Sequence, residues 1–232
     1  MKRRFLVAFL GFTAMLALAV ASYAGDVMIK FTNPKSAPHN TYGGFYVGIY
    51  LGTVNGVQTE FVCDDFLHDI TLGQQWSAVP GSTNPVTGGV EFGPLPLGVP
   101  ITNPALLSSD LTQQQEYNMI TYLADQIFAD QDNSHGNWGY LSWAIWSITD
   151  HAWDNSTYYT APVQYDVAQA LAHDNNNGDL NVFTPDPNTA GQEFLSTPEA
   201  SSVLLLGIFL AAGAALLLTK KKLATPELLG DC

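Results

Sequence analysis

Two β-rich segments, separated by a sharp turn, lie in the first third of the chain. Residues 45–63 read FYVGIYLGTVNGVQTEFVC, with Asn55-Gly56 between the two segments. Asn-Gly is favoured in two-residue hairpin turns because both central positions need a positive φ. The pattern therefore predicts an antiparallel hairpin. Its register pairs Val54 with Val57, Tyr50 with Phe61, Ile49 with Val62 and Gly48 with Cys63.

Three later segments have the apolar spacing of helices. Residues 110–129 begin at Asp110, with Gln113 three positions on, which is typical of a helix N-terminus. A second helix is expected over 138–153, and a third over 161–173 with Thr160 as its cap. The fold class predicted is α+β, in which N-terminal antiparallel β hairpins pack with a later group of α-helices.

Proline and small polar residues mark the segments between these elements. Residues 77–106 contain six prolines and five glycines, which favours a loop. Residues 184–197 read TPDPNTAGQEFLST and are interpreted as a linker. The folded domain is therefore predicted to end at residue 183, and residues 25–183 are expected to form it.

Charge excludes one large class of function. The 232 residues carry 8 lysines and arginines against 21 acidic residues, a net charge of -13. Residues 25–197 hold two lysines and 18 acids, because Glu199, Glu227 and Asp231 lie beyond them, so this part carries a net charge of -16. Nucleic-acid binding requires a basic surface, which this balance excludes. The 47% hydrophobic content also excludes a disordered acidic tail.

The N-terminus has the three parts of a secretory signal peptide. Lys2, Arg3 and Arg4 precede an apolar segment that ends in Ala21-Ser22-Tyr23-Ala24. Ser22 and Ala24 have the small side chains that a signal peptidase accepts at its cleavage site. Residues 1–24 are therefore predicted to be a signal peptide and the mature chain to start at Gly25, with an uncleaved anchor helix as the alternative.

The C-terminus has the length and flanking charge of a membrane anchor. Residues 200–219 are uncharged, and Lys220, Lys221 and Lys222 follow them at once. Twenty helical residues span about 30 Å, the thickness of a hydrocarbon core. Because basic residues stay on the cytoplasmic side, residues 223–232 are predicted to be a cytoplasmic tail and the acidic domain to face outward.

The residues around this segment resemble the PEP-CTERM sorting signal of Gram-negative exported proteins. Pro198 and Glu199 match the start of its Pro-Glu-Pro tripeptide, Ala200 replaces the second proline, and the apolar segment and basic cluster follow. The resemblance covers residues 198–222. It implies recognition by an exosortase, inner-membrane anchoring before processing, and then a surface or extracellular location.

Cys63 is the lone cysteine of the expected mature domain, because Cys232 lies in the tail. Cysteines of exported proteins normally pair, so a lone one invites several interpretations. Cys63 could be a small buried hydrophobe at a strand end, an intermolecular disulfide, a catalytic thiolate or half of an internal thioester.

The residues near Cys63 and in the second helix resemble the thioester domains of Gram-positive surface adhesins. Phe61-Val62-Cys63-Asp64 matches the cysteine segment, and Ala144-Ile145-Trp146 matches the end of the Thr-Gln-x-Ala-Ile-Trp motif. The resemblance covers residues 43–153 and implies an acylating Cys–Gln bond. Ser142 stands at the glutamine position and Leu141 at the threonine position, so the scaffold is expected without its covalent chemistry.

Two further kinds of site can be drawn from the sequence. Cys63, His151 and Asp150 could form a cysteine hydrolase set, with His68 as another histidine near the thiol. Clusters at Asp130-x-Asp132-x-Ser134 and Asp174-x-Asn176 have calcium-like residues, but neither follows the EF-hand pattern. We therefore expect no catalytic residue, cofactor or metal.

The function predicted is that of an exported structural or binding protein. Its expected partners are signal peptidase, exosortase and an extracellular polysaccharide or surface matrix. A thioester adhesin and a cysteine hydrolase are the alternatives.

Overall fold

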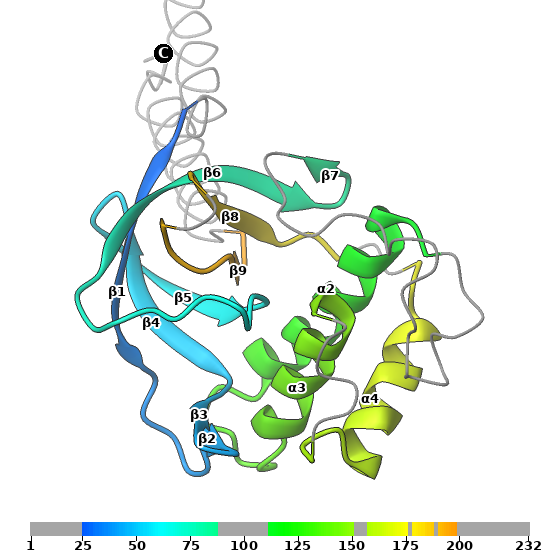
Figure 1. Cartoon of the computed structure of the whole chain (residues 1–232). Coiled ribbons are helices and arrows are strands. Elements are labelled where there is room, and N and C mark those ends of the chain that lie inside the picture. Colours follow the sequence, from blue (N-terminus) through cyan, green and yellow to red (C-terminus); the bar gives the residue numbers. More distant parts are fainter. Residues whose placement is uncertain (1–24, 88–110, 151–156, 176–177, 188–189, 199–232) are drawn as a thin grey trace, which may run out of the picture. The chain divides into compact units, whose positions relative to one another are not determined.

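A computed structural model describes residues 25–87, 111–150, 157–175, 178–187 and 190–198 (Figure 1). The predicted signal peptide, the anchor at 200–219, Lys220 to Lys222 and the tail lie outside these residues. Within them, no helix is long and apolar enough to cross a membrane. Residues 25–198 belong to one compact unit.

Six antiparallel strands of this unit close into a barrel (Figure 1). In order around the barrel they are β1 (Val27–Pro34), β4 (Ile49–Val54), β5 (Val57–Cys63), β9 (Phe194–Ser196), β8 (Asn181–Pro185) and β6 (Gln75–Thr83). Strand β6 pairs back onto β1, with Val27 opposite Ala78. Closure leaves these strands without the unpaired edges that make open sheets aggregate.

Two short additions flank the barrel. Strand β7 (Val86–Thr87) folds back and pairs antiparallel with the end of β6, and β2 (Thr41–Tyr42) pairs with β3 (Phe45–Tyr46) in a separate small hairpin. The β2–β3 hairpin is followed directly by β4. It therefore places Phe45 and Tyr46 beside the start of a barrel strand.

Three helices pack together beside the barrel (Figure 1). They are α2 (Gln113–Ala129), α3 (Trp138–Thr149) and α4 (Ala161–Leu171). The mixed α+β class is therefore confirmed. Helix α2 begins later than predicted, because Thr112 and Gln115 form a capping box in place of Asp110 and Gln113.

The predicted hairpin is confirmed in its turn and register. Asn55 and Gly56 have φ values of 51° and 84°. The β4–β5 ladder runs from Val54 opposite Val57 to Ile49 opposite Val62. The two-residue turn thus decides which side chains share a face.

Alternation along these strands produces two separate hydrophobic clusters. One fills the barrel and contains Val27, Ile29, Phe31, Tyr50, Val54, Phe61, Cys63, Trp76, Ala78, Phe183 and Phe194. The other lies between the barrel wall and the helices. Ile49, Val62, Val182 and Leu195 contribute to it from the strands, and α2, α3 and α4 contribute the rest.

The prediction that residues 184–197 form a linker is wrong. This segment contains the end of β8 and all of β9, and Phe194 and Leu195 are completely buried. Strand β9 has three residues, which are too few to show the alternation of a strand. Its partners are β8 and β5, and β5 lies more than 130 residues earlier in the chain. The folded domain therefore extends beyond residue 183 to residue 198.

The prediction that residues 77–106 form a loop is also partly wrong. Strand β6 runs through Pro80 to Thr83, and β7 follows it. The barrel accepts Pro80 opposite Phe183 in the β6–β8 ladder. Residues 88–106 lie outside the described residues.

Gly48 sets how closely α3 approaches the barrel. Its φ is +82°, and a Cβ atom there would lie 2.1 Å from the Trp138 ring. No side chain fits at that distance. The absence of a side chain at Gly48 therefore lets the start of α3 seat against the start of β4.

Candidate functional site at the barrel mouth

The Cys63 thiol is buried inside the barrel. Its side chain is 2% exposed, and Sγ donates a hydrogen bond to the Asp65 carbonyl oxygen over 2.9 Å. Burial, followed by the charges of Asp65 and Asp64, raises the pKa of Cys63 well above its usual value. The thiol therefore stays protonated, and a protonated thiol is a poor nucleophile.

The Cys63 side chain packs in the cluster inside the barrel and meets the second helix at Trp146. Cys63 does share a face with Tyr50 and Phe61, as predicted, but that face lines the barrel interior. Helix α3 reaches Cys63 through Trp146, whose Nε1 donates to the Cys63 carbonyl oxygen over 3.1 Å and whose side chain also hydrogen-bonds the thiol. Val62 and Ile49 point to the other side of the strands and pack against the helices.

Ser142 lies close to the strand end that carries Cys63. Its Oγ accepts a hydrogen bond from Gly48 N over 3.0 Å, and both groups are buried. Gly48 immediately precedes β4, one position beyond the pair formed by Ile49 and Val62. The residue at the glutamine position of the thioester motif is therefore held against the β4–β5 hairpin.

Asp64 and Glu193 form a buried carboxyl pair on the helix side of the barrel. Both side chains are 0% exposed. Burial, then the charge and hydrogen bonding of Glu193, raises the pKa of Asp64 well above its usual value. Glu193 also accepts hydrogen bonds from Tyr117 Oη, over 2.5 Å, and from Thr184 Oγ1. No substrate reaches this pair, because it is closed to solvent.

Asp65 shapes the loop that follows β5. One of its oxygens accepts the backbone N–H groups of Leu67 and His68, and the other lies 2.8 Å from His68 Nδ1. His68 is therefore oriented by Asp65. His151 lies outside the described residues, and Asp150 caps the end of α3, so the predicted hydrolase set is not assembled within them.

The first calcium-like cluster is used for a turn. The Asp130 carboxylate accepts hydrogen bonds from Ser134 N, Ser134 Oγ and His135 N. Burial opposes ionisation, but these hydrogen bonds outweigh it and lower the pKa of Asp130. In the second cluster, Asp174 accepts from Gln115, and Asn176 lies outside the described residues. Among the described residues, no group of acidic, histidine or cysteine side chains is arranged to hold a metal ion.

A cleft of about 420 Å³ opens at the mouth of the barrel, next to the loop that follows β5. Its floor includes Phe31 and Tyr50 from the barrel interior. Its walls come from five places: the end of β1, the β2–β3 hairpin, the loop after β5, helix α3, and the segment before β9. They comprise Pro34, Gly44, Phe45, Tyr46, Phe66, Leu67, Asp69, Ile70, Leu72, Trp146 and Gln192.

Exposed apolar side chains gather at this cleft. Seven large hydrophobic residues are exposed in the described part of the chain, and four of them line it: Phe45, Tyr46, Leu67 and Leu72. Exposed apolar residues scattered singly need no explanation, but a gathered set marks an interaction site. Barrel mouths are also a common place for ligand sites.

A connected set of aromatic rings supports one wall of the cleft. The Phe66 ring lies 4.9 Å from that of Phe45 and 4.9 Å from that of Trp146, centroid to centroid. Trp143 lies behind them, 5.2 Å from Phe66, and stacks on Tyr158 at 4.8 Å. Packed rings have few alternative side-chain positions, so the rings of this wall keep their arrangement relative to one another before a ligand binds.

Two polar side chains stand among these apolar residues. Gln192 Nε2 donates to the Asp65 carbonyl oxygen over 3.0 Å, which leaves its Oε1 as an acceptor at the cleft. Asp69 adds an exposed carboxylate. The cleft thus combines an apolar surface with a few hydrogen-bonding groups, which is the usual composition of a ligand site.

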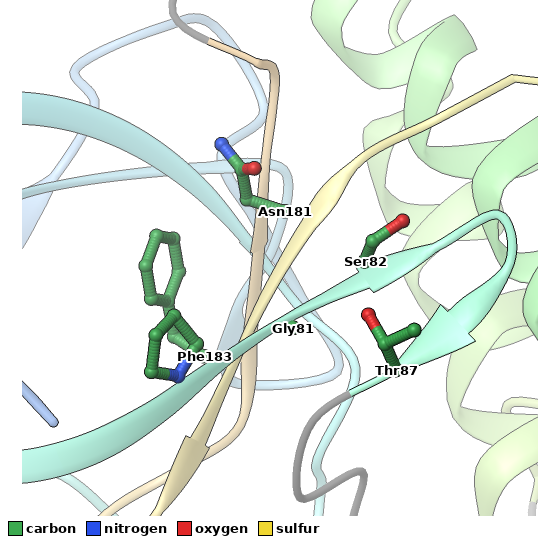
Figure 2. Close-up of a pocket in the computed structure, with 6 residues that line it drawn as sticks. Gly81, Ser82, Thr87, Asn181 and Phe183 are labelled. Carbon is green, nitrogen blue, oxygen red and sulfur yellow. The ribbon is translucent and has the colours of Figure 1, made fainter. Parts of the chain in front are cut away.

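A second, smaller pocket of about 250 Å³ lies along β6, β7 and β8 (Figure 2). Its labelled polar residues are Ser82, Thr87 and Asn181. Ser82 Oγ already donates to Asp179 over 2.6 Å, and the Phe183 ring is 1% exposed. This pocket therefore offers a ligand little apolar surface, and the barrel mouth is the stronger candidate.

None of the cleft residues is predicted by the sequence patterns. One signal was present: Gly43-Gly44 followed by Phe45-Tyr46, two aromatic residues beside a turn. Both glycines have a positive φ, and the turn they make exposes the two rings. Comparison with protein families, with curated proteins and with solved structures gives no match for this chain.

Proposed function

We propose that the chain is an exported, exosortase-sorted surface or matrix protein whose acidic domain binds a ligand at the barrel mouth without covalent chemistry. One observation carries the binding role. Four exposed hydrophobic side chains gather on a packed aromatic wall at a cleft of about 420 Å³. Export rests on the two ends of the sequence, the signal peptide at 1–24 and the PEP-CTERM-like residues 198–222.

The ligand proposed is a neutral sugar ring of an extracellular polysaccharide. A pyranose has an apolar C–H face that packs on an aromatic ring, and hydroxyl groups at its edge that need acceptors. Tyr46 is 53% exposed and offers such a ring, while Gln192 and Asp69 offer acceptors. An anionic polymer is disfavoured because residues 25–197 carry a net charge of -16, with Lys30 and Lys35 their two lysines and no arginine among them.

The state of the Cys63 side chain supports a role without covalent chemistry. A buried thiol with a raised pKa does not attack a substrate readily. Ser142 at the glutamine position has no acyl group to offer, although its contact with Gly48 fits a scaffold of the thioester type. We propose that such a scaffold has been kept and its covalent step lost.

Binding can be tested by titrating the protein with neutral polysaccharide purified from its native cells, with tryptophan fluorescence as the signal, since Trp146 lines the cleft. Tyr46→Ala should weaken binding at least tenfold, because truncating an aromatic residue that anchors a binding surface costs about 2 kcal/mol or more. Tyr165→Ala is the matched control, since Tyr165 is 64% exposed on α4 and away from the cleft lining. Equal binding by both variants would rule out the barrel mouth.

Sorting has its own test. Replacing Pro198 and Glu199 should leave the protein in the inner membrane, whereas the native protein should start at Gly25 and lack peptides from residues 204–218. A native product that keeps those peptides in most molecules would contradict sorting, and it would leave the binding proposal untouched.

A further inference from the structure

Asp64 and Glu193 face each other across two barrel strands. Strands β5 and β9 are antiparallel, with Cys63 opposite Phe194, so Asp64 and Glu193 occupy the next opposed positions. Both are completely buried. Two carboxylates placed so closely in an apolar surrounding cannot both carry a charge.

The hydrogen bonds indicate which member carries the proton. Glu193 accepts at both of its oxygens, from Tyr117 on α2 and from Thr184 on β8. Burial and Glu193 oppose ionisation of Asp64, and in the described part of the chain its own backbone N–H is the one donor that favours it. Two donors stabilise an ionised Glu193, whereas a protonated Asp64 can donate to it.

The other charged groups near the pair do not compensate a second negative charge. Cys63 at the end of β5 and Asp65 in the loop after it are titratable neighbours of the pair, and Tyr117 reaches it from α2. Helix α3 contributes the Thr149 hydroxyl, which donates to the Asp64 carbonyl oxygen over 2.7 Å. His68 is held by Asp65, and Lys35 is paired with Glu60 over 2.9 Å.

The carboxyl pair lies directly behind two walls of the cleft. Gln192 precedes Glu193, and Phe66 follows two residues after Asp64. The two walls are joined by the hydrogen bond from Gln192 Nε2 to the Asp65 carbonyl oxygen. Any separation of the ends of β5 and β9 therefore moves Gln192 away from Asp65 and opens the cleft wall.

We propose that one proton shared between Asp64 and Glu193 positions the walls of the barrel-mouth cleft and makes that cleft sensitive to pH. Loss of the proton places two like charges at opposed positions and pushes the two strand ends apart. Asp64 and Glu193 are positioning residues, since neither touches the cleft. The effect on ligand binding rests on the proposed function, but the effect on the cleft wall does not.

The proton and the wall can each be measured on the full-length protein without a ligand. Infrared spectra recorded at a pH well above the usual pKa of aspartate should contain a protonated-carboxyl band that disappears in Asp64→Asn and remains in Asp69→Asn, the control at the exposed rim. The side-chain amide signal of Gln192 in NMR spectra should shift with pH in the native protein and stay constant in Asp64→Asn. Asparagine mimics a protonated aspartate as a donor, so this variant should fold.

Three results would overturn the inference. The band could persist in Asp64→Asn, which would place the proton elsewhere. The Gln192 signal could stay constant while the band of the native protein disappears with rising pH, which would separate the proton from the wall. If both signals behave as expected but polysaccharide binding stays constant over the same pH range, control of ligand binding by the shared proton would be ruled out. Absence of any polysaccharide binding, with both signals as expected, would contradict the proposed function alone.

Discussion

Cys63 and Asp64 are neighbours in the chain, yet they lie on opposite faces of the barrel wall. The Cys63 side chain points into the barrel and Asp64 toward the helices, and both are almost completely buried. Burial favours the neutral form of each group. A neutral thiol suits an apolar interior and becomes inert, whereas a neutral carboxyl still needs a hydrogen-bond partner and finds it in Glu193.

The cleft draws on both faces of this wall. Phe31 and Tyr50 rise into it from the barrel interior, and Gln192 and Phe66 belong to the segments that hold the carboxyl pair. The inner face thus provides a fixed floor. The outer face provides walls whose position depends on a proton.

The largest effect expected on the outer face comes from Glu193→Leu. This change removes the acceptor for Tyr117 and Thr184 and the partner of Asp64. Each buried donor left without its acceptor costs about 1–3 kcal/mol. Urea unfolding should show that loss, and Glu60→Leu should cost under about 1 kcal/mol because Glu60 forms a half-exposed ion pair with Lys35. Equal losses in the two variants would contradict the importance of the buried pair.

Gly48→Ala should follow in size, since it disturbs the contact between the barrel and α3. A left-handed backbone costs an alanine about 1–2 kcal/mol, and overpacking against the Trp138 ring adds about 1–3 kcal/mol. Gly56→Ala is the matched control. Its φ is +84°, but no atom lies within 4 Å of the added Cβ. Thermal unfolding of both variants should therefore show the larger loss at Gly48, and a larger loss at Gly56 would contradict the close approach.

Stability should depend on pH through the outer face. The pKa of Asp64 is higher in the folded protein than in the unfolded chain, so its contribution is complete at acidic pH and is lost as pH rises through the folded value. Burial also raises the pKa of Asp125, and that of Asp166 to about 6, which adds to the same slope below neutral pH. Urea unfolding at increasing pH should show falling stability, and Asp64→Asn should make that fall smaller. An unchanged slope in that variant would refute the assignment of the proton to Asp64.

The smallest effect on stability is expected on the inner face. Cys63→Ala removes one small buried group and should cost about 1 kcal/mol. A bulky thiol reagent should label native Cys63 slowly, and label it quickly only after unfolding in urea. Fast labelling of the folded protein would show a reactive thiol and restore the crosslinking and hydrolase alternatives.

Local signals explain which parts of the fold could be predicted. Asn55-Gly56 defines a turn by backbone conformation alone, and the turn then decides the register of the whole hairpin. The helices show their period over eleven residues or more. Strand β9 has three residues and partners distant in sequence, so nothing near it in the chain predicts its place in the barrel.

The same limit explains why the candidate site was missed. The position of Cys63 on the Tyr50 and Phe61 face followed from strand alternation, but that this face lines a closed barrel depended on β1 pairing with β6. The cleft joins residues from positions 31 to 192, and the carboxyl pair joins residues 64 and 193. Both exist only after the barrel has closed.

Binding isotherms of two variants test the central claim most directly, which is that the barrel mouth binds a neutral polysaccharide while Cys63 remains inert. The full-length protein, Cys63→Ala and Tyr46→Ala would each be titrated with the same neutral polysaccharide from the native cells. Cys63→Ala should bind as the unchanged protein does, and Tyr46→Ala should bind at least tenfold more weakly, given the exposed ring it removes at the cleft. Binding that is lost in Cys63→Ala and kept in Tyr46→Ala would contradict the claim and assign the function to the thiol.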